Sequence, residues 1–212
     1  MAQIILINGK KRSGKDWNAN LIKQELEERG FSTQIMSFAE PLKNIISETF
    51  DISPEDLEKY KNESLDYGLE IKAYPNNQPS VVIDYINFRT ILQRFGTEAM
   101  KKWFGDDVWL ELLLKRVNDA SVDYILVPDF RFKVECIEKS ITLKIKNDEY
   151  DNAGDLHASE TELDDFEFQY YIDNTGYPDT TSQIKEFVEF ITENRYKVDL
   201  LSKINEYVSD IS

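Results

Sequence analysis

The chain has 212 residues, 41% of them hydrophobic and 31% charged, and its formal net charge at pH 7 is −15. This length suits one well-packed core and is borderline for two. The acidic excess argues against a protein that coats DNA or RNA, because such binding depends on cations that neutralise phosphates, but it leaves room for a small phosphorylated ligand held by a local cluster of cations.

The first predicted elements are a strand, a glycine-rich turn and a helix. Residues 4–7 form a short apolar run that is typical of a buried strand. Residues 9–16, GKKRSGKD, follow it and fit the phosphate-binding pattern G-x-x-x-x-G-K. Apolar residues at Ala19, Ile22 and Leu26 then predict one buried face of a helix that ends near residue 30.

Such a turn is suited to binding phosphate. The first N–H groups of a helix have no partner within the helix, the helix dipole is positive there, and Lys15 adds a full charge. Asp16 stands where a Ser or Thr usually binds magnesium, and a carboxylate there would repel phosphate unless a metal lay between them. The alternative is an ordinary strand-turn-helix corner. We expect a nucleoside triphosphate to be bound by Gly9, Lys10, Lys11, Arg12, Ser13, Gly14, Lys15 and Asp16.

The middle of the chain is predicted to be mainly helical. Residues 33–38 indicate a second strand, Pro41 begins a helix, and Ser53 caps a shorter one. Residues 61–80 are polar and irregular, as in an insert that covers a substrate. A helical period returns at about residue 87 and is interrupted by a glycine at 96. We interpret the aromatic residues that follow as core rather than as stacking partners of a ligand: Trp103, Phe104 and Trp109.

The last part of the chain alternates again between strands and helices. Apolar runs predict strands at 124–127, 141–145 and 168–172, with helices at about 134–138 and 183–192. An acidic stretch covers 147–165, and one further helix is expected from 197. Strands that alternate with helices predict an α/β protein, with a parallel five-stranded sheet and helices on both faces.

In such a sheet, ligands bind at the carboxyl ends of the strands. This places residues 9–15, 38–43 and 129–131 on one common edge. Asp129 directly follows an apolar strand, where a carboxylate can hold magnesium or orient the attacking oxygen; the alternative is a helix N-cap. Arg131 could neutralise a phosphoryl group in transfer, or form an ion pair with a nearby carboxylate.

The chain resembles the deoxynucleoside monophosphate kinases of tailed bacteriophages. The resemblance covers about three quarters of the chain and is carried, in this order, by residues 9–16 (GKKRSGKD), 38–43 (FAEPLK), 89–98 (RTILQRFGTE), 127–131 (VPDFR) and 157–160 (HASE). Its most specific parts are the loop ending in Lys-Asp and the segment LQxxGTE. In that family Asp replaces Ser or Thr after the loop lysine, as Asp16 does here.

The resemblance implies a three-layer P-loop kinase fold over residues 1–212, with a substrate-binding insert at about 53–105 and a lid at about 147–165. It also implies transfer of a phosphoryl group from ATP to a deoxynucleoside 5′-monophosphate, with Mg²⁺, and a possible homodimer. By position, Asp16 and Asp129 would serve the metal. Lys43, Arg89 and Arg131 would contact the acceptor phosphate or the transferred group. Gln93 and Glu98 would contact the sugar or the base.

The sequence departs from this family at several positions. Trp17 stands where a small polar residue is expected, and Lys101 stands where an Arg is frequent. Residues 147–160 contain no Arg, so a cation for the transition state has to come from elsewhere, such as Arg12 or Arg131. His157 lies in the supposed lid, where we interpret it as a hydrogen-bonding or packing residue, because phosphoryl transfer needs positioning more than a strong base.

Two other functions remain open at this stage. Animal-type phosphomevalonate kinases are similar in the loop and in the Pro-Leu-Lys segment, and residues 164–166 (DDF) invite that comparison. A nucleotide-binding protein without catalytic activity is the other, with the helix from 197 as a docking surface.

The sequence also bears on location. No stretch approaches 18 apolar residues, and the N-terminus lacks a secretory signal, so we expect a cytoplasmic protein, in the host cell if a phage encodes it. The single Cys136 excludes an internal disulfide and is interpreted as a small residue that packs on a helix.

Overall fold

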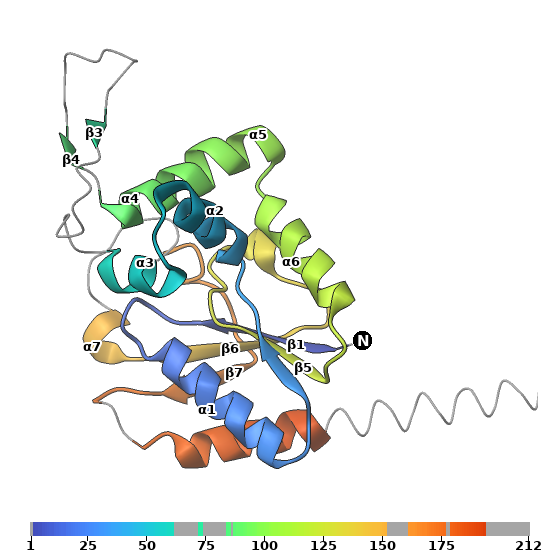
Figure 1. Cartoon of the computed structure of the whole chain (residues 1–212). Coiled ribbons are helices and arrows are strands. Elements are labelled where there is room, and N and C mark those ends of the chain that lie inside the picture. Colours follow the sequence, from blue (N-terminus) through green and yellow to red (C-terminus); the bar gives the residue numbers. More distant parts are fainter. Residues whose placement is uncertain are drawn as a thin grey trace, which may run out of the picture. The chain divides into compact units, whose positions relative to one another are not determined.

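The computed structural model describes residues 2–61, 72–73, 84–85, 87–151, 161–176 and 179–193 (Figure 1). The chain divides into two compact units, of which the first contains residues 1–37 and 117–212 and the second contains 38–116. The second unit includes most of the insert expected at about 53–105. Residues 152–160 of the expected lid, including His157, and the helix expected from 197 lie outside the described residues.

The first unit is built on a five-stranded parallel sheet with the order β2-β5-β1-β6-β7. Its strands are β1 (Gln3–Asn8), β2 (Thr33–Ile35), β5 (Tyr124–Val127), β6 (Ile141–Lys146) and β7 (Tyr170–Asp173). All four residues of β5 are fully buried, as are three consecutive residues of β1, which explains why these strands are continuous apolar runs. The sheet confirms the predicted α/β class, and the burial of both faces of its central strands agrees with a layered fold.

One face of the sheet packs against two helices. Helix α1 (Lys15–Glu28) presents Ala19, Ile22 and Leu26 to the sheet, and all three are fully buried, as their spacing predicted. The second helix runs over residues 181–193, close to its predicted bounds, and is drawn in red-orange below the sheet in Figure 1. It adds to the same cluster Ile184, Phe187, Val188 and Ile191.

Phenylalanine rings make a second cluster within this unit. Phe130, Phe166 and Phe168 meet in edge-to-face pairs with ring centroids 4.8 to 6.2 Å apart. The Lys144 ammonium lies 5.6 Å from the centre of the Phe168 ring. Because Lys144 alternates along β6 with the buried Leu143 and Ile145, this cluster lies on the opposite face of the sheet from α1.

Three local predictions for this unit are corrected. The second strand ends at Ile35 rather than at residue 38, although the Met36 N–H still donates to the Leu126 carbonyl at 2.9 Å. Residues 134–138 do not form a helix; there is only the 3₁₀ turn η3 (Lys133–Glu135), because the buried Glu135 carboxylate accepts the N–H groups of Arg131 and Phe132 and closes the chain into a turn. Cys136 follows that turn and is exposed, so it does not pack on a helix.

The second unit is mainly helical. Its elements are α2 (Glu40–Phe50), α3 (Pro54–Tyr60), the antiparallel pair β3 (Lys72–Ala73) and β4 (Asp84–Tyr85), α4 (Phe88–Gln93), the π-helix η2 (Arg94–Lys101), α5 (Lys102–Phe104) and α6 (Val108–Asp119), whose last residues belong to the first unit. Ser53 caps α3 as predicted, because its Oγ accepts the Asp56 N–H at 3.0 Å. Asn87 caps α4 in the same way through the Thr90 N–H at 2.9 Å.

The aromatic residues of this unit do not all join its core. Trp109 is buried and its indole N–H donates to the Gly96 carbonyl at 3.2 Å, but Trp103 is 79% exposed and Phe104 is 67% exposed. The prediction that all three are core is therefore wrong for two of them. They lie in the last turn of the continuous helical stretch made by α4, η2 and α5, which stops at Gly105 with a φ of 101°, and no residue of α5 is buried.

The structure also bears on the membrane. Throughout the residues that it describes, no helix combines the length and the apolar character needed to cross a bilayer.

Candidate phosphate-binding site

The loop 9–14 connects the central strand β1 to α1, and its geometry requires glycine at both ends. A Cβ atom on Gly9 would lie 2.4 Å from the Ser13 Oγ and 3.0 Å from the Ile145 carbonyl oxygen. Gly14 has a φ of 84°, and a Cβ on it would lie 2.3 Å from the Asn174 Nδ2. Both ends of the motif are thus fixed by the backbone conformation and by close approach.

Helix α1 begins directly after this loop. The Asn18 N–H donates to the Gly14 carbonyl at 2.9 Å, which closes the first turn, and Lys15 is the first helical residue. The Lys15 ammonium lies 3.1 Å from the Asp16 carboxylate; the lysine side chain is 13% exposed and that of Asp16 is 73% exposed. The loop, a helix N-terminus and a lysine are therefore arranged in the order that an anion site requires.

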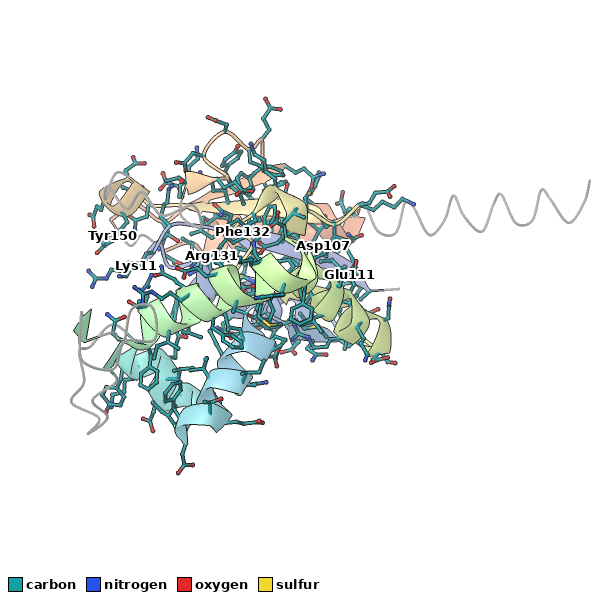
Figure 2. All side chains as sticks on the ribbon, turned by 90° about the horizontal axis from the view of Figure 1, so that it is seen from above. Lys11, Asp107, Glu111, Arg131, Phe132 and Tyr150 are labelled. Atoms are coloured by element: carbon teal, nitrogen blue, oxygen red, sulfur yellow. The ribbon has the colours of Figure 1, made fainter. Side chains whose placement is uncertain are left out.

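Lys10, a second cation of the loop, contacts the C-terminal end of the expected lid. The Lys10 ammonium forms an ion pair with the Asp164 carboxylate, which is half exposed. This contact joins residues that are 154 positions apart in the sequence. Figure 2 shows the side chain of Lys11, the neighbour of Lys10, together with those of Arg131 and Tyr150, with the ribbon seen from above.

The end of β5 lies next to the start of the loop, as predicted. The Asn8 side-chain amide donates to the Phe130 carbonyl at 2.8 Å, and the Phe130 N–H donates to the Ile7 carbonyl at 3.3 Å. Asp129 accepts the Ser37 hydroxyl at 2.6 Å. Asp129 does not cap a helix, because the next helical turn along this described stretch is η3, which follows Phe132.

Asp16 and Asp129 are the carboxylates expected to serve a metal. The residues that the structure describes contain no cluster of three or more His, Cys, Asp or Glu that could hold an ion. Magnesium in nucleotide sites is commonly bound by one or two carboxylates together with phosphate oxygens and water, rather than by a cage of protein ligands. The two carboxylates, one exposed and one half-buried, fit that mode of binding.

Buried polar side chains form hydrogen bonds that support the loop and the start of α1. These hydrogen bonds were not predicted from the sequence. Asn174, at the end of β7, donates from its Nδ2 to the Ser13 carbonyl at 2.8 Å. The Asn147 Nδ2 donates to the Asn174 carbonyl at 3.0 Å, and the Thr180 hydroxyl donates to the Asn18 Oδ1 at 2.8 Å. The available signal was an Asp-Asn-Thr-Gly run directly after a predicted strand, at the edge where the loop lies.

The same turn contains a carboxylate with a perturbed pKa. Hydrogen bonds from the Thr175 hydroxyl and the Thr175 backbone N–H hold the pKa of Asp173 below its ordinary value, and the Lys146 charge acts in the same direction. The hydrogen bond from the Thr175 backbone N–H to the Asp173 Oδ1 has a length of 2.8 Å between the nitrogen and the oxygen. Because Asp173 directly precedes Asn174, this ionised side chain helps to fix the turn that holds the loop.

The other predicted site residues belong to the second unit. Lys43 on α2 forms an ion pair with Glu58 of α3 at 3.0 Å. Arg89 and Gln93 lie four residues apart on α4, so their side chains share one face of that helix. Glu98 is exposed on the π-helix η2.

The π-helix coincides with the segment LQxxGTE that carries the resemblance most specifically. Its hydrogen bonds run from residue i to i+5, a form that is rare and is often found at functional sites. Gly96 is buried within it: a Cβ there would lie 2.9 Å from a methyl carbon of Leu42. The prediction that this glycine interrupts the helix is therefore wrong; the glycine instead allows α2 to approach closely.

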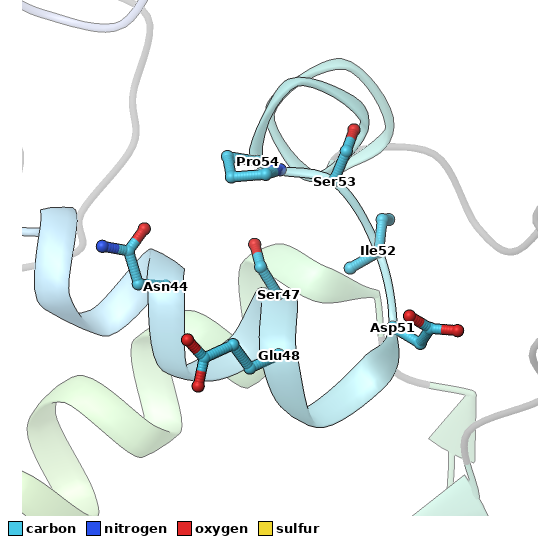
Figure 3. Close-up of a pocket in the computed structure, with 7 residues that line it drawn as sticks. All are labelled: Asn44, Ser47, Glu48, Asp51, Ile52, Ser53 and Pro54. Atoms are coloured by element: carbon cyan, nitrogen blue, oxygen red, sulfur yellow. The ribbon is translucent and has the colours of Figure 1, made fainter.

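A hollow of about 350 Å³ lies between the end of α2 and the start of α3 (Figure 3). It contains none of the site residues predicted from the sequence. The Ser47 Oγ is buried and has no hydrogen-bond partner among the described residues. The lining residues are Asn44, Ser47, Glu48, Asp51, Ile52, Ser53 and Pro54.

Comparison with known proteins assigns the chain to no group: no protein-family model matches it, and no curated protein matches it.

Proposed function

We propose that this protein is a kinase that transfers the γ-phosphoryl group of ATP to a deoxynucleoside 5′-monophosphate. The observation that carries the proposal is the glycine-bounded loop between β1 and α1, with Lys15 as the first residue of the helix. This arrangement concentrates backbone N–H groups and a fixed cation where triphosphate oxygens bind.

The proposed chemistry rests on alignment and on charge neutralisation rather than on a strong base. The loop N–H groups and Lys15 hold the phosphates of the donor. Arg131 neutralises charge that develops on the phosphoryl group in transfer. Asp16 and Asp129 would hold a magnesium ion, whose charge would offset that of the phosphates.

Exclusion of water separates a kinase from a hydrolase, and the ion pair between Lys10 and Asp164 supports a lid in the expected place. It joins the loop to the end of the segment 147–165. A lid at this position would keep water from the γ-phosphate while the acceptor is bound.

The identity of the acceptor rests on the resemblance and on the second unit. Lys43 is only about one third exposed and is paired with Glu58, so an acceptor phosphate would exchange one anionic partner for another. Arg89 and Gln93 share a face of α4. The Arg89 guanidinium would bind the phosphate of a nucleotide, and the Gln93 amide would bind its sugar or base.

The test is the release of ADP from MgATP by the purified protein, with each of the four common deoxynucleoside monophosphates and without an acceptor. We expect fast release with particular monophosphates only. Lys15→Ala should lower the rate about 100-fold or more, since it removes a charge that acts on the transferred group. Lys23→Ala is the matched control, because Lys23 is on the same helix and pairs with Glu27 at 3.7 Å, away from the loop.

A background rate with all four acceptors would refute the proposed substrate class. Phosphomevalonate should then be tried as the acceptor in the same assay. If ATP bound without turnover of any acceptor, the protein would be a nucleotide-binding protein without kinase activity.

A further inference from the structure

Asn174 follows the edge strand β7, and its side chain contacts the backbone of the loop. It is only 5% exposed, and its Nδ2 donates to the Ser13 carbonyl at 2.8 Å. We propose that Asn174 is a positioning residue, which sets the orientation of the Ser13–Gly14 peptide and so aims the Gly14 N–H at the bound phosphates. The inference rests on the proposed binding of a triphosphate at this loop.

The geometry of the peptide group carries the first step. A trans peptide is planar, and its C=O and N–H bonds point in opposite directions; the described residues contain no cis peptide. When Asn174 holds the Ser13 oxygen toward β7, the Gly14 N–H must point away from β7. In a loop at a helix N-terminus, that direction is the concave side where an anion binds.

The next peptide is held in the same sense by a different residue. The Gly14 carbonyl accepts two hydrogen bonds from Asn18, one from its N–H at 2.9 Å and one from its Nδ2 at 3.0 Å. The Lys15 N–H therefore points away from the body of the helix as well. Two consecutive N–H groups are oriented together, which is the arrangement of an anion-binding nest.

Asn174 is itself held rigidly, as a positioning residue must be. Its N–H donates to the Lys146 carbonyl at 2.8 Å, and its carbonyl accepts the Asn147 Nδ2 at 3.0 Å. On its N-terminal side, the Gln183 side chain accepts the Asp173 N–H at 2.9 Å and donates to the Asp173 carbonyl at 3.0 Å. Asn174 therefore has its backbone fixed on both sides.

The contact also explains the glycine at position 14. Any side chain there would meet the Asn174 Nδ2 at 2.3 Å, so the loop can approach this amide only with a glycine. The left-handed φ of Gly14 would by itself require a glycine, but it would not require close approach to Asn174. The close approach therefore indicates that the loop conformation depends on its contact with the Asn174 amide.

The alternative is that Asn174 contributes to folding stability and to nothing else. Thr192 allows the two to be separated, since it is similarly buried and its hydroxyl donates to a backbone carbonyl at 2.8 Å, but that carbonyl belongs to Val188 in the same helix and not to the loop. Asn174→Asp and Thr192→Val each remove a buried donor with almost no change of shape. Asn174→Ala removes the donor without adding a charge.

The measurements are titration calorimetry with inorganic triphosphate and with MgATP, and the melting temperature of each variant. We expect Asn174→Asp and Asn174→Ala to weaken the binding of both ligands at least tenfold, while Thr192→Val lowers the melting temperature and changes the affinity for both ligands less than threefold. In steady state, the loss for Asn174→Ala should appear in the KM for ATP, with the KM for the acceptor unchanged.

Three outcomes would overturn the inference. Equal loss of affinity in the variants of Thr192 and Asn174 would reduce the contact to general stability. Unchanged affinity in folded Asn174→Ala would show that the peptide holds its orientation alone, with the proposed kinase unaffected. If the unaltered protein bound neither ligand, the proposed function would fail first and the inference with it.

Discussion

The close approach of Gly9 to Ser13 gives a stability prediction that follows directly from the geometry. In Gly9→Ala, the new Cβ would lie 2.4 Å from the Ser13 Oγ and 3.0 Å from the Ile145 carbonyl oxygen. The first contact involves a short, fully buried side chain, and the second involves the backbone of β6, which cannot move without the sheet. Overpacking of this kind costs about 1–3 kcal/mol. For a chain of this size we expect the melting temperature to fall by about 2–12 °C.

The partner in the first contact allows a sharper test. The Ser13 Oγ has no hydrogen-bond partner among the described residues, so Ser13→Ala should be neutral or slightly stabilising, since it removes a buried hydroxyl without leaving another group unpaired. In the double variant, the 2.4 Å contact is absent and only the 3.0 Å contact remains. Gly9→Ala should then cost at least about 0.5 kcal/mol less than it does alone.

Urea unfolding of the four proteins gives the coupling energy, and calorimetry with MgATP reports on the loop. A Gly9→Ala protein that is as stable as the starting protein would refute the described geometry. Additive effects within about 0.3–0.5 kcal/mol would show that the cost arises elsewhere, for example at the β6 carbonyl.

Two further predictions concern charge near the loop. Asp164→Asn should release Lys10 for the phosphates and raise the affinity for MgATP about two- to fivefold, measured by calorimetry at low salt. The gain in affinity should fade at high ionic strength, because the ion pair is partly exposed. Weaker binding of MgATP by Asp164→Asn would show that Asp164 does not compete with the phosphates for Lys10. Because the pKa of Asp173 is lowered in the folded protein, its contribution to stability is present above the ordinary pKa and is lost as the pH falls through the lowered value. The difference in melting temperature between the protein and Asp173→Asn should therefore close below about pH 4, and a constant difference from pH 3 to 7 would contradict this.

The parts of the fold that could be predicted from the sequence are those with local signals. The apolar run at 4–7, the glycine pattern and the spacing of Ala19, Ile22 and Leu26 lie within 25 residues of one another, and all three elements form where expected. Strands β1 and β5 were found because each is a buried apolar run, whereas β2 and β7 also contain exposed residues. Their bounds differed where hydrogen bonding decided the end of an element, as at Ile35.

The parts that could not be predicted depend on partners far away in the sequence. Nothing near Ser13 indicates that its carbonyl is held by a residue 161 positions away. Trp103 and Phe104 were expected in the core as large aromatic residues, but they lie in the last helical turn before Gly105, where no residue is buried. The turn at 133–135 formed because one buried carboxylate, Glu135, accepts two N–H groups, a choice that apolar spacing does not report.

The support that Asn174 gives the loop has a consequence for how the protein is made. The loop is synthesised well before β7, because 161 positions separate Ser13 from Asn174. Domains are synthesised at about 5–20 residues per second, so the two halves of this contact emerge many seconds apart. The binding loop can reach its final shape only after the strand order has been closed at β7. Nascent chains that stop before residue 174 should therefore carry the whole glycine motif and still bind triphosphate poorly.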